Sequence, residues 1–122
     1  MRVLAFDPGH TTGIAFVVDY QPKMVMIIDN HLLTDQYIVN LYELFLPDVV
    51  AIETAPNHVL ADRLTKILVD QIDRNVQKTG CRVCRIPPGL WKPVSSKPDK
   101  SWAIHGADAL GLALYTERVH HG

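Results

Sequence analysis

Residues 2–18 read RVLAFDPGHTTGIAFVV, two apolar runs on either side of a short polar stretch that contains two glycines. The first run, Arg2 to Asp7, and the second, Ile14 to Val18, have the composition of β-strands. Between them, Pro8-Gly9-His10-Thr11-Thr12-Gly13 is rich in residues that favour turns. This stretch therefore predicts an antiparallel hairpin in which an acidic residue, Asp7, ends the first strand.

The next segments extend the hairpin into a sheet with a helix beside it. Lys23 to Asp29 follows a turn at residues 19–22 and predicts a third strand. Apolar residues then recur at helical spacing between Thr34, a good N-cap residue, and Pro47, which stops the helix. The continuous apolar stretch in Asp48 to Glu53 is typical of a strand that is covered on both faces, and it ends in a second acid.

Two more helices and one more strand complete the prediction. A long helix is expected from about Asn57 to Lys78, closed by Gly80, and a fifth strand from Cys81 to Ile86. Pro87 to Lys100 is rich in Pro, Ser and Lys and predicts an irregular loop, and the last helix is expected over Ser101 to Val119. The order βββαβαβα predicts an α/β fold: a mixed five-stranded sheet, three antiparallel strands and then two parallel ones, flanked by helices.

The composition is that of a globular protein. The chain has 122 residues, 48% hydrophobic and 20% charged, which predicts one folded domain over residues 1–122. No apolar run is long enough for a membrane span, and the first residues lack the pattern of a signal peptide, so we expect a cytoplasmic protein with no membrane partner. The two cysteines, Cys81 and Cys84, are too few to hold a zinc ion, and we expect two packed thiols.

Four acidic or imidazole side chains lie at the ends of predicted elements. Asp7 ends the first strand, Glu53 ends the fourth, and His105 and Asp108 share one face near the start of the last helix because they are three residues apart. Each of them alone is explained as well by a turn, a solvated or capping acid, or a packed histidine. Grouped carboxylates would repel one another, and bound Mg²⁺ or Mn²⁺ would remove that repulsion. The joint order and spacing therefore favour a metal site.

This joint pattern resembles the RuvC-type Holliday-junction resolvases of the ribonuclease H-like superfamily. The resemblance rests on residues 6–9 (FDPG) with 12–15 (TGIA), on 51–53 (AIE) and on 105–113 (HGADALGLA). The family has an Asp-Pro-Gly first strand followed by Thr-Gly, an Ile-Glu strand end and a final helix with Asp/His-x-x-Asp-Ala. The element order matches over essentially the whole chain, so the resemblance implies a ribonuclease H-like sheet and a RuvC-like nuclease domain.

The resemblance also implies a reaction. Asp7, Glu53, His105 and Asp108 would be the catalytic residues and would bind two Mg²⁺ or Mn²⁺ ions, one to activate water and one to stabilise the leaving 3′ oxygen. The expected enzyme is a crossover-junction endodeoxyribonuclease that cuts branched DNA by paired symmetric nicks, as a homodimer formed through the helix at 57–78. Because His105 stands where an all-carboxylate site has an acid, Mn²⁺ should be favoured more strongly than in such a site.

The chain departs from the typical bacterial enzymes in three places. The turn after Asp7 is shorter, residues 54–57 (TAPN) lack the aromatic residue that usually follows the glutamate, and the stretch before His105 is too short for an additional helix. Junction opening would therefore use other groups or be weaker. Phage-encoded relatives are compact in this way, so the resemblance implies a compact, phage-type member.

Binding to DNA requires the positive charge to be segregated, since the formal net charge is −1. Between residues 78 and 100, six basic residues stand against one acid, Asp99. The predicted DNA-binding residues are Lys78, Arg82, Arg85, Trp91, Lys92, Lys97 and Lys100. A solvated loop that is merely basic is the alternative interpretation.

Two other functions stay open at this point. A general structure-selective or RNA-directed nuclease of the same superfamily would use the same chemistry, and a junction-binding protein that does not cut would lack it. An actin-like or sugar-kinase-like ATPase shares an Asp-x-Gly motif in its first hairpin but needs two lobes, for which 122 residues are too few.

Overall fold

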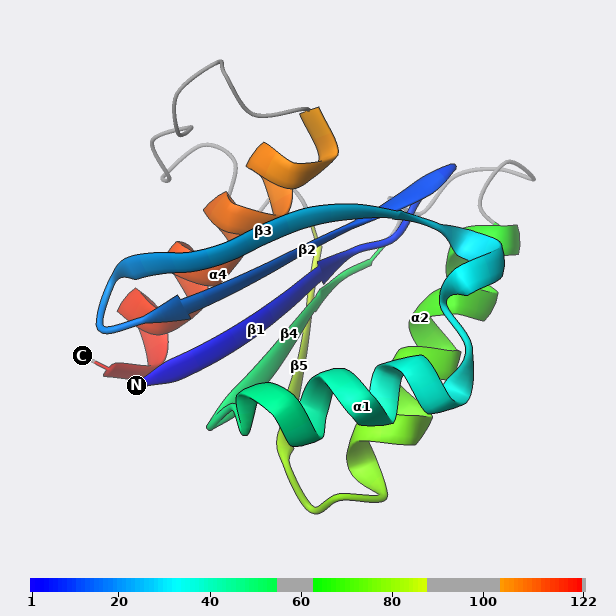
Figure 1. The fold of residues 1–122 in the computed structure, drawn as a ribbon. Helices are drawn as coiled ribbons and strands as arrows, with labels where there is room; N and C mark the ends of the chain where they lie inside the picture. Colours follow the sequence, from blue (N-terminus) through cyan, green and yellow to red (C-terminus); the bar gives the residue numbers. More distant parts are fainter. Residues whose placement is uncertain (55–62, 88–103, 122) are drawn as a thin grey trace.

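Five β-strands form a mixed sheet in the computed structural model, which describes residues 1–54, 63–87 and 104–121, with side chains only from 108 to 120 in the last range. The sheet order is β3-β2-β1-β4-β5 (Figure 1). β1, β2 and β3 pair antiparallel, whereas β4 and β5 continue the sheet parallel to β1. The strands are β1 (Arg2–Asp7), β2 (Thr11–Val18), β3 (Gln21–Asp29), β4 (Val49–Glu53) and β5 (Arg82–Ile86). The predicted α/β sheet is thus confirmed.

Helices cover both faces of this sheet. α1 (Asp35–Phe45) and α2 (Arg63–Gln77) lie on one face, and α4 (Ile104–His121) lies on the other (Figure 1). A short 3₁₀ helix, η1 (Asn30–Leu32), leads from β3 toward α1. Of the predicted helices, residues 57–62 and 101–103 lie outside the described residues, and Lys78 follows α2 rather than belonging to it. No helix within the described ranges is long and apolar enough to cross a membrane.

The two hairpin turns are shorter than the sequence predicts. β2 begins at Thr11, so the first turn is only Pro8 to His10, because the ladder to β3 extends back to the pair Thr11–Asp29. The second turn is Asp19-Tyr20 alone, and both residues have positive φ, 50° and 65°. Two positive φ values are typical of the type I′ turn, whose twist matches that of the flanking strands.

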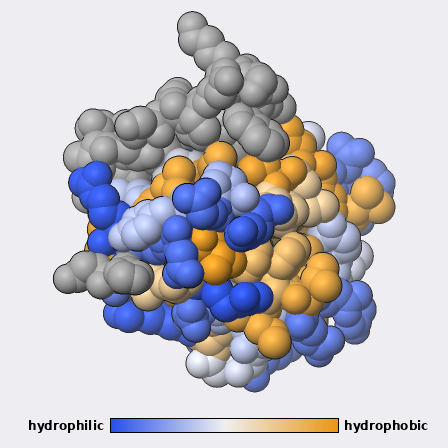
Figure 2. Space-filling view, turned by 60° about the vertical axis from the view of Figure 1, so that its left-hand side comes forward, coloured by the Kyte–Doolittle hydropathy of each residue, from blue (hydrophilic) through white to orange (hydrophobic). Residues whose placement is uncertain are grey.

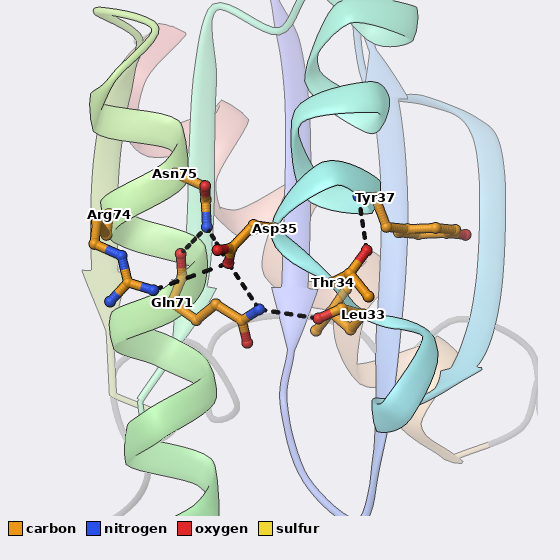
Figure 3. Close-up of polar contacts among 7 residues, drawn as sticks. All are labelled: Leu33, Thr34, Asp35, Tyr37, Gln71, Arg74 and Asn75. Atoms are coloured by element: carbon orange, nitrogen blue, oxygen red, sulfur yellow. Dashed lines mark hydrogen bonds and ion pairs between the residues drawn. The ribbon is translucent and has the colours of Figure 1, made fainter.

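Polar contacts hold both ends of α1. At its start, the Thr34 side chain accepts a hydrogen bond from the Tyr37 backbone N–H. Asp35 accepts hydrogen bonds from Gln71 (3.0 Å) and Asn75 (2.8 Å) of α2, and these bonds lower the pKa of its carboxyl group (Figure 3). At the other end, the Arg2 guanidinium donates to the Phe45 carbonyl and lies over the Phe16 ring. α1 is therefore fixed to α2 and to the sheet.

The buried surface of α2 does not include all of its apolar residues. Leu64 and Ile67 are 51% and 62% exposed. The side chains that α2 buries are Leu68, Val69, Ile72, Asp73, Asn75 and Val76. At 3.6 residues per turn this set is centred roughly a third of a turn away from Leu64 and Ile67. The buried set includes two polar residues, Asp73 and Asn75, and both have hydrogen-bond partners.

Apolar side chains also reach the surface beside the edge strand β3. Met24 and Met26 of β3 line a groove together with Tyr37, Leu41, Leu44 and Phe45 of α1. Figure 2 shows apolar side chains gathered over part of one face of the molecule, with hydrophilic side chains around them.

The two cysteines are free thiols on opposite faces of the sheet. Cys81 packs against the core beneath α1 and α2, and Cys84 packs beneath α4, with its Sγ atom 3.2 Å from Nε2 of His120. Burial raises the pKa of both thiols. Their packing follows the prediction.

Candidate active site

Asp7 and Glu53 end two strands that lie side by side. β1 and β4 are parallel, and their register pairs Phe6 with Ile52, the residues just before the two acids. Asp7 and Glu53 are each only 7% exposed. Two carboxylates are therefore brought to one edge of the sheet and largely removed from water, where negative charge is costly without a compensating partner.

The alternation of side chains places both acids on the face covered by α4. Phe6 and Ile52 belong to the core beneath α1 and α2, whereas Ala5 and Ala51 belong to the core beneath α4. Because successive side chains of a strand point to opposite faces, the next residues, Asp7 and Glu53, lie on the α4 side.

Asp108 lies on the helix that covers this face. Figure 1 shows that α4 runs antiparallel to β1, since its C-terminal end lies beside the N-terminus of the chain. The first turns of α4 therefore lie toward the end of the sheet where β1 and β4 stop. Asp108 is partly buried there, and the neighbouring Ala109 and Leu110 are buried against the sheet.

His105 falls in the first turn of α4, but its side chain lies outside the described residues. Among the described side chains, no three from His, Cys, Asp or Glu are grouped closely enough to hold a metal ion. The structure thus places Asp7 and Glu53 at neighbouring strand ends and Asp108 on the helix over the same face, and the described side chains alone do not form a metal site. Their donor chemistry fits Mg²⁺ or Mn²⁺, because both ions prefer carboxylate oxygens.

The turn after Asp7 is held by a side chain that the sequence did not point to. The Asn30 amide donates from Nδ2 to the carbonyl oxygens of Gly9 (2.6 Å) and His10 (3.0 Å). Its Oδ1 atom accepts a hydrogen bond of 2.7 Å from the Thr12 hydroxyl. An asparagine just after a predicted strand carries no local signal of such a role, because its three partners, two in the turn and one at the start of β2, lie about 20 residues earlier in the chain.

The predicted DNA-binding residues fall into different environments. Arg85 is held by α2, since its Nε atom donates to Asp73 (2.6 Å) and its Nη2 atom to Asp70 (3.0 Å), and these bonds raise its pKa, chiefly the one to Asp73. Lys78 and Arg82 are exposed. Trp91, Lys92, Lys97 and Lys100 lie outside the described residues.

Comparison with solved structures identifies the fold. The chain superposes on RuvC of T. thermophilus in complex with a Holliday junction substrate with a TM-score of 0.79 and 16% identity, over 100% of this chain and 96% of that one. A second structure of Thermus thermophilus RuvC gives 0.74 and 16%, over 98% and 97%. The sequence matches no protein-family model and no curated protein. On this likeness the chain has a RuvC-like fold of the ribonuclease H type.

Proposed function

We propose that this protein is a metal-dependent endonuclease that cuts branched DNA, with the four-way junction as its main substrate. A fold alone supports many functions, so the proposal depends on the site. The observation that carries it is the position of Asp7 and Glu53, two carboxylates 7% exposed at adjacent strand ends, on the face covered by the helix that bears Asp108. The solved relative bound to a Holliday junction supports the choice of substrate.

Asp7, Glu53, His105 and Asp108 are the residues that would hold two Mg²⁺ or Mn²⁺ ions. When bound, such ions supply an activated water and stabilise the leaving oxygen of the phosphodiester. The chain itself contributes three carboxylates and one imidazole, a formal charge of −3 rather than the −4 of an all-acid set. The burial of Asp7 and Glu53 excludes most water around the carboxylates, which strengthens their attraction for a cation.

Synthetic substrates separate this proposal from its alternatives. We expect the protein with Mn²⁺ or Mg²⁺ to cut a four-way junction faster than a flap, a linear duplex or an RNA–DNA hybrid. Equal rates on all of them would indicate the general nuclease. Tight junction binding without cleavage in either metal would indicate a binding protein.

The basic segment from Lys78 to Lys100 is the proposed contact to the DNA backbone. Lys92→Ala and Lys97→Ala should each lower the slope of log affinity against log salt by roughly one, because each removes about one phosphate contact. Lys23→Ala is the matched control, since Lys23 is exposed on β3, at the opposite edge of the sheet from β5. If the two loop variants keep the slope of the unmodified protein, this segment does not bind the backbone.

The exposed flank of α2 is the proposed homodimer interface, and a dimer would place two active sites for paired cuts. Leu64 and Ile67 are three residues apart and therefore share one side of the helix. Sedimentation at micromolar concentration should show a dimer. Leu64→Glu should weaken the dimer by about tenfold or more, because it puts a charge in place of an exposed apolar side chain that the interface would bury. Leu44→Glu, on the exposed side of α1, is the control. A protein that is monomeric even with junction DNA present would contradict this arrangement.

A further inference from the structure

The Asn30 side chain is committed to the turn that follows Asp7. Asn30 is the first residue of η1, directly after β3. Its side-chain amide contacts the β1–β2 turn and the first residues of β2. Two of its partners, the carbonyls of Gly9 and His10, can only accept, so they must face the NH₂ group. The oxygen of the amide is then left to accept from Thr12. One orientation of the amide therefore satisfies all three bonds.

The buried hydroxyl of Thr12 favours this orientation of the Asn30 amide. Its side chain is 0% exposed, and its backbone pairs with Ile28 of β3. A buried hydroxyl without a partner costs about 1–3 kcal/mol, so the bond to Asn30 is strongly favoured over an unpaired hydroxyl. Thr12 thus holds Asn30, and Asn30 holds the two carbonyls of the turn.

The turn in question joins Asp7 directly to the next strand. On its N-terminal side Asp7 is fixed by β1, where Phe6 pairs with both Ile14 and Ile52. On its C-terminal side the chain leaves the sheet at Pro8 and returns at Thr11. The hydrogen bonds from Asn30 to Gly9 and His10 fall within that interval, and we call Asn30 and Thr12 together the clamp. We propose, on the basis of the function proposed above, that Asn30 and Thr12 are positioning residues that hold the Asp7 carboxylate where it can bind a divalent cation.

Groups that orient a metal ligand without touching the metal typically change metal affinity about 10- to 100-fold when they are removed. Asn30→Ala and Thr12→Val should therefore weaken Mn²⁺ binding by about tenfold or more, measured without DNA by electron paramagnetic resonance of the free ion. Thr12→Val keeps the β-branched shape of the strand residue. Thr12→Ser keeps the hydroxyl and should bind Mn²⁺ as the unmodified protein does.

Asn40→Ala is the matched control, because Asn40 is bonded to Gln36 within α1 and not to the turn. Thermal unfolding without metal measures how much each substitution lowers the stability of the fold. Weaker Mn²⁺ binding by folded Asn30→Ala and Thr12→Val, with unchanged Thr12→Ser and Asn40→Ala, supports the positioning role. Folded clamp variants that bind Mn²⁺ with unmodified affinity overturn it. If the unmodified protein binds no Mn²⁺ and cuts no junction, the proposed function itself fails, and this inference fails with it.

Discussion

Asp7→Asn is expected to reduce metal-dependent junction cleavage by more than about a hundredfold, since removing even the groups that only orient a ligand costs 10- to 100-fold. Asparagine has the same shape as aspartate but no charge, so it offers a cation a much weaker ligand. The fold should be retained, because Asp7 lies at the end of β1 beside another acid, and neutralising it relieves repulsion between like charges. Single-turnover cleavage and denaturant unfolding measure the two effects separately.

Glu53→Gln should have the same effect as Asp7→Asn, because Glu53 is equally buried at the neighbouring strand end. The controls make the same chemical changes far from this edge. Asp48→Asn lies before β4, at its opposite end, and Glu43→Gln lies on the exposed surface of α1. A fully active Asp7→Asn variant would show that the acids at these strand ends do not serve the reaction.

Arg85→Ala is expected to lower the free energy of unfolding by about 2 kcal/mol, between the values for an exposed and a buried ion pair. Asp73 is the reason, since this carboxylate is buried in α2 and accepts from Arg85 and Gln77, both at 2.6 Å. Without the guanidinium it keeps only the amide partner. Denaturant unfolding of Arg85→Ala measures the loss, and Asp73→Asn should reproduce most of it.

Arg82→Ala is the matched comparison, because Arg82 is exposed on the same strand and forms none of the ion pairs in the described part of the chain. If Arg85 acts mainly as a tie between β5 and α2, its replacement changes stability and leaves the salt dependence of DNA binding nearly unchanged. Arg82→Ala should do the reverse and lower the salt slope by roughly one. An Arg85→Ala variant of full stability with a lower salt slope of DNA binding would show instead that Arg85 contacts the DNA backbone.

The sheet and the two strand-end acids could be predicted because their signals are local. Apolar runs of four or five residues define β1, β2 and β4, and Asp7 and Glu53 stand at the ends of two of them. The start of β2 could not be read in the same way. Thr11 and Thr12 follow Pro8 and Gly9 and have turn composition, and only pairing with β3 makes them part of the strand.

The polar interior could not be predicted, because burial of a polar side chain depends on partners far away in the sequence. From the sequence, Asp73 is expected on the exposed side of its helix, because it is charged. It is buried beside Arg85, which lies on β5 and donates a hydrogen bond to it. Glu117 of α4 is 0% exposed, and neither of its carboxylate oxygens has a hydrogen-bond partner in the described ranges. The apolar Val119, on the same helix, is 53% exposed. α4 carries apolar residues all around its axis, so its periodicity does not identify a buried side.

Metal-dependent cutting of a four-way junction can be followed strand by strand on one synthetic substrate. A synthetic junction is labelled on each strand in turn and incubated with the unmodified protein in Mn²⁺, in Mg²⁺ and in chelator. The proposed function predicts nicks at symmetric positions in two strands of like polarity, with ligatable 5′-phosphate ends, in the presence of metal and not in chelator. An unmodified protein that leaves the junction uncut in both metals, although it is folded and binds the DNA, would contradict the proposed function.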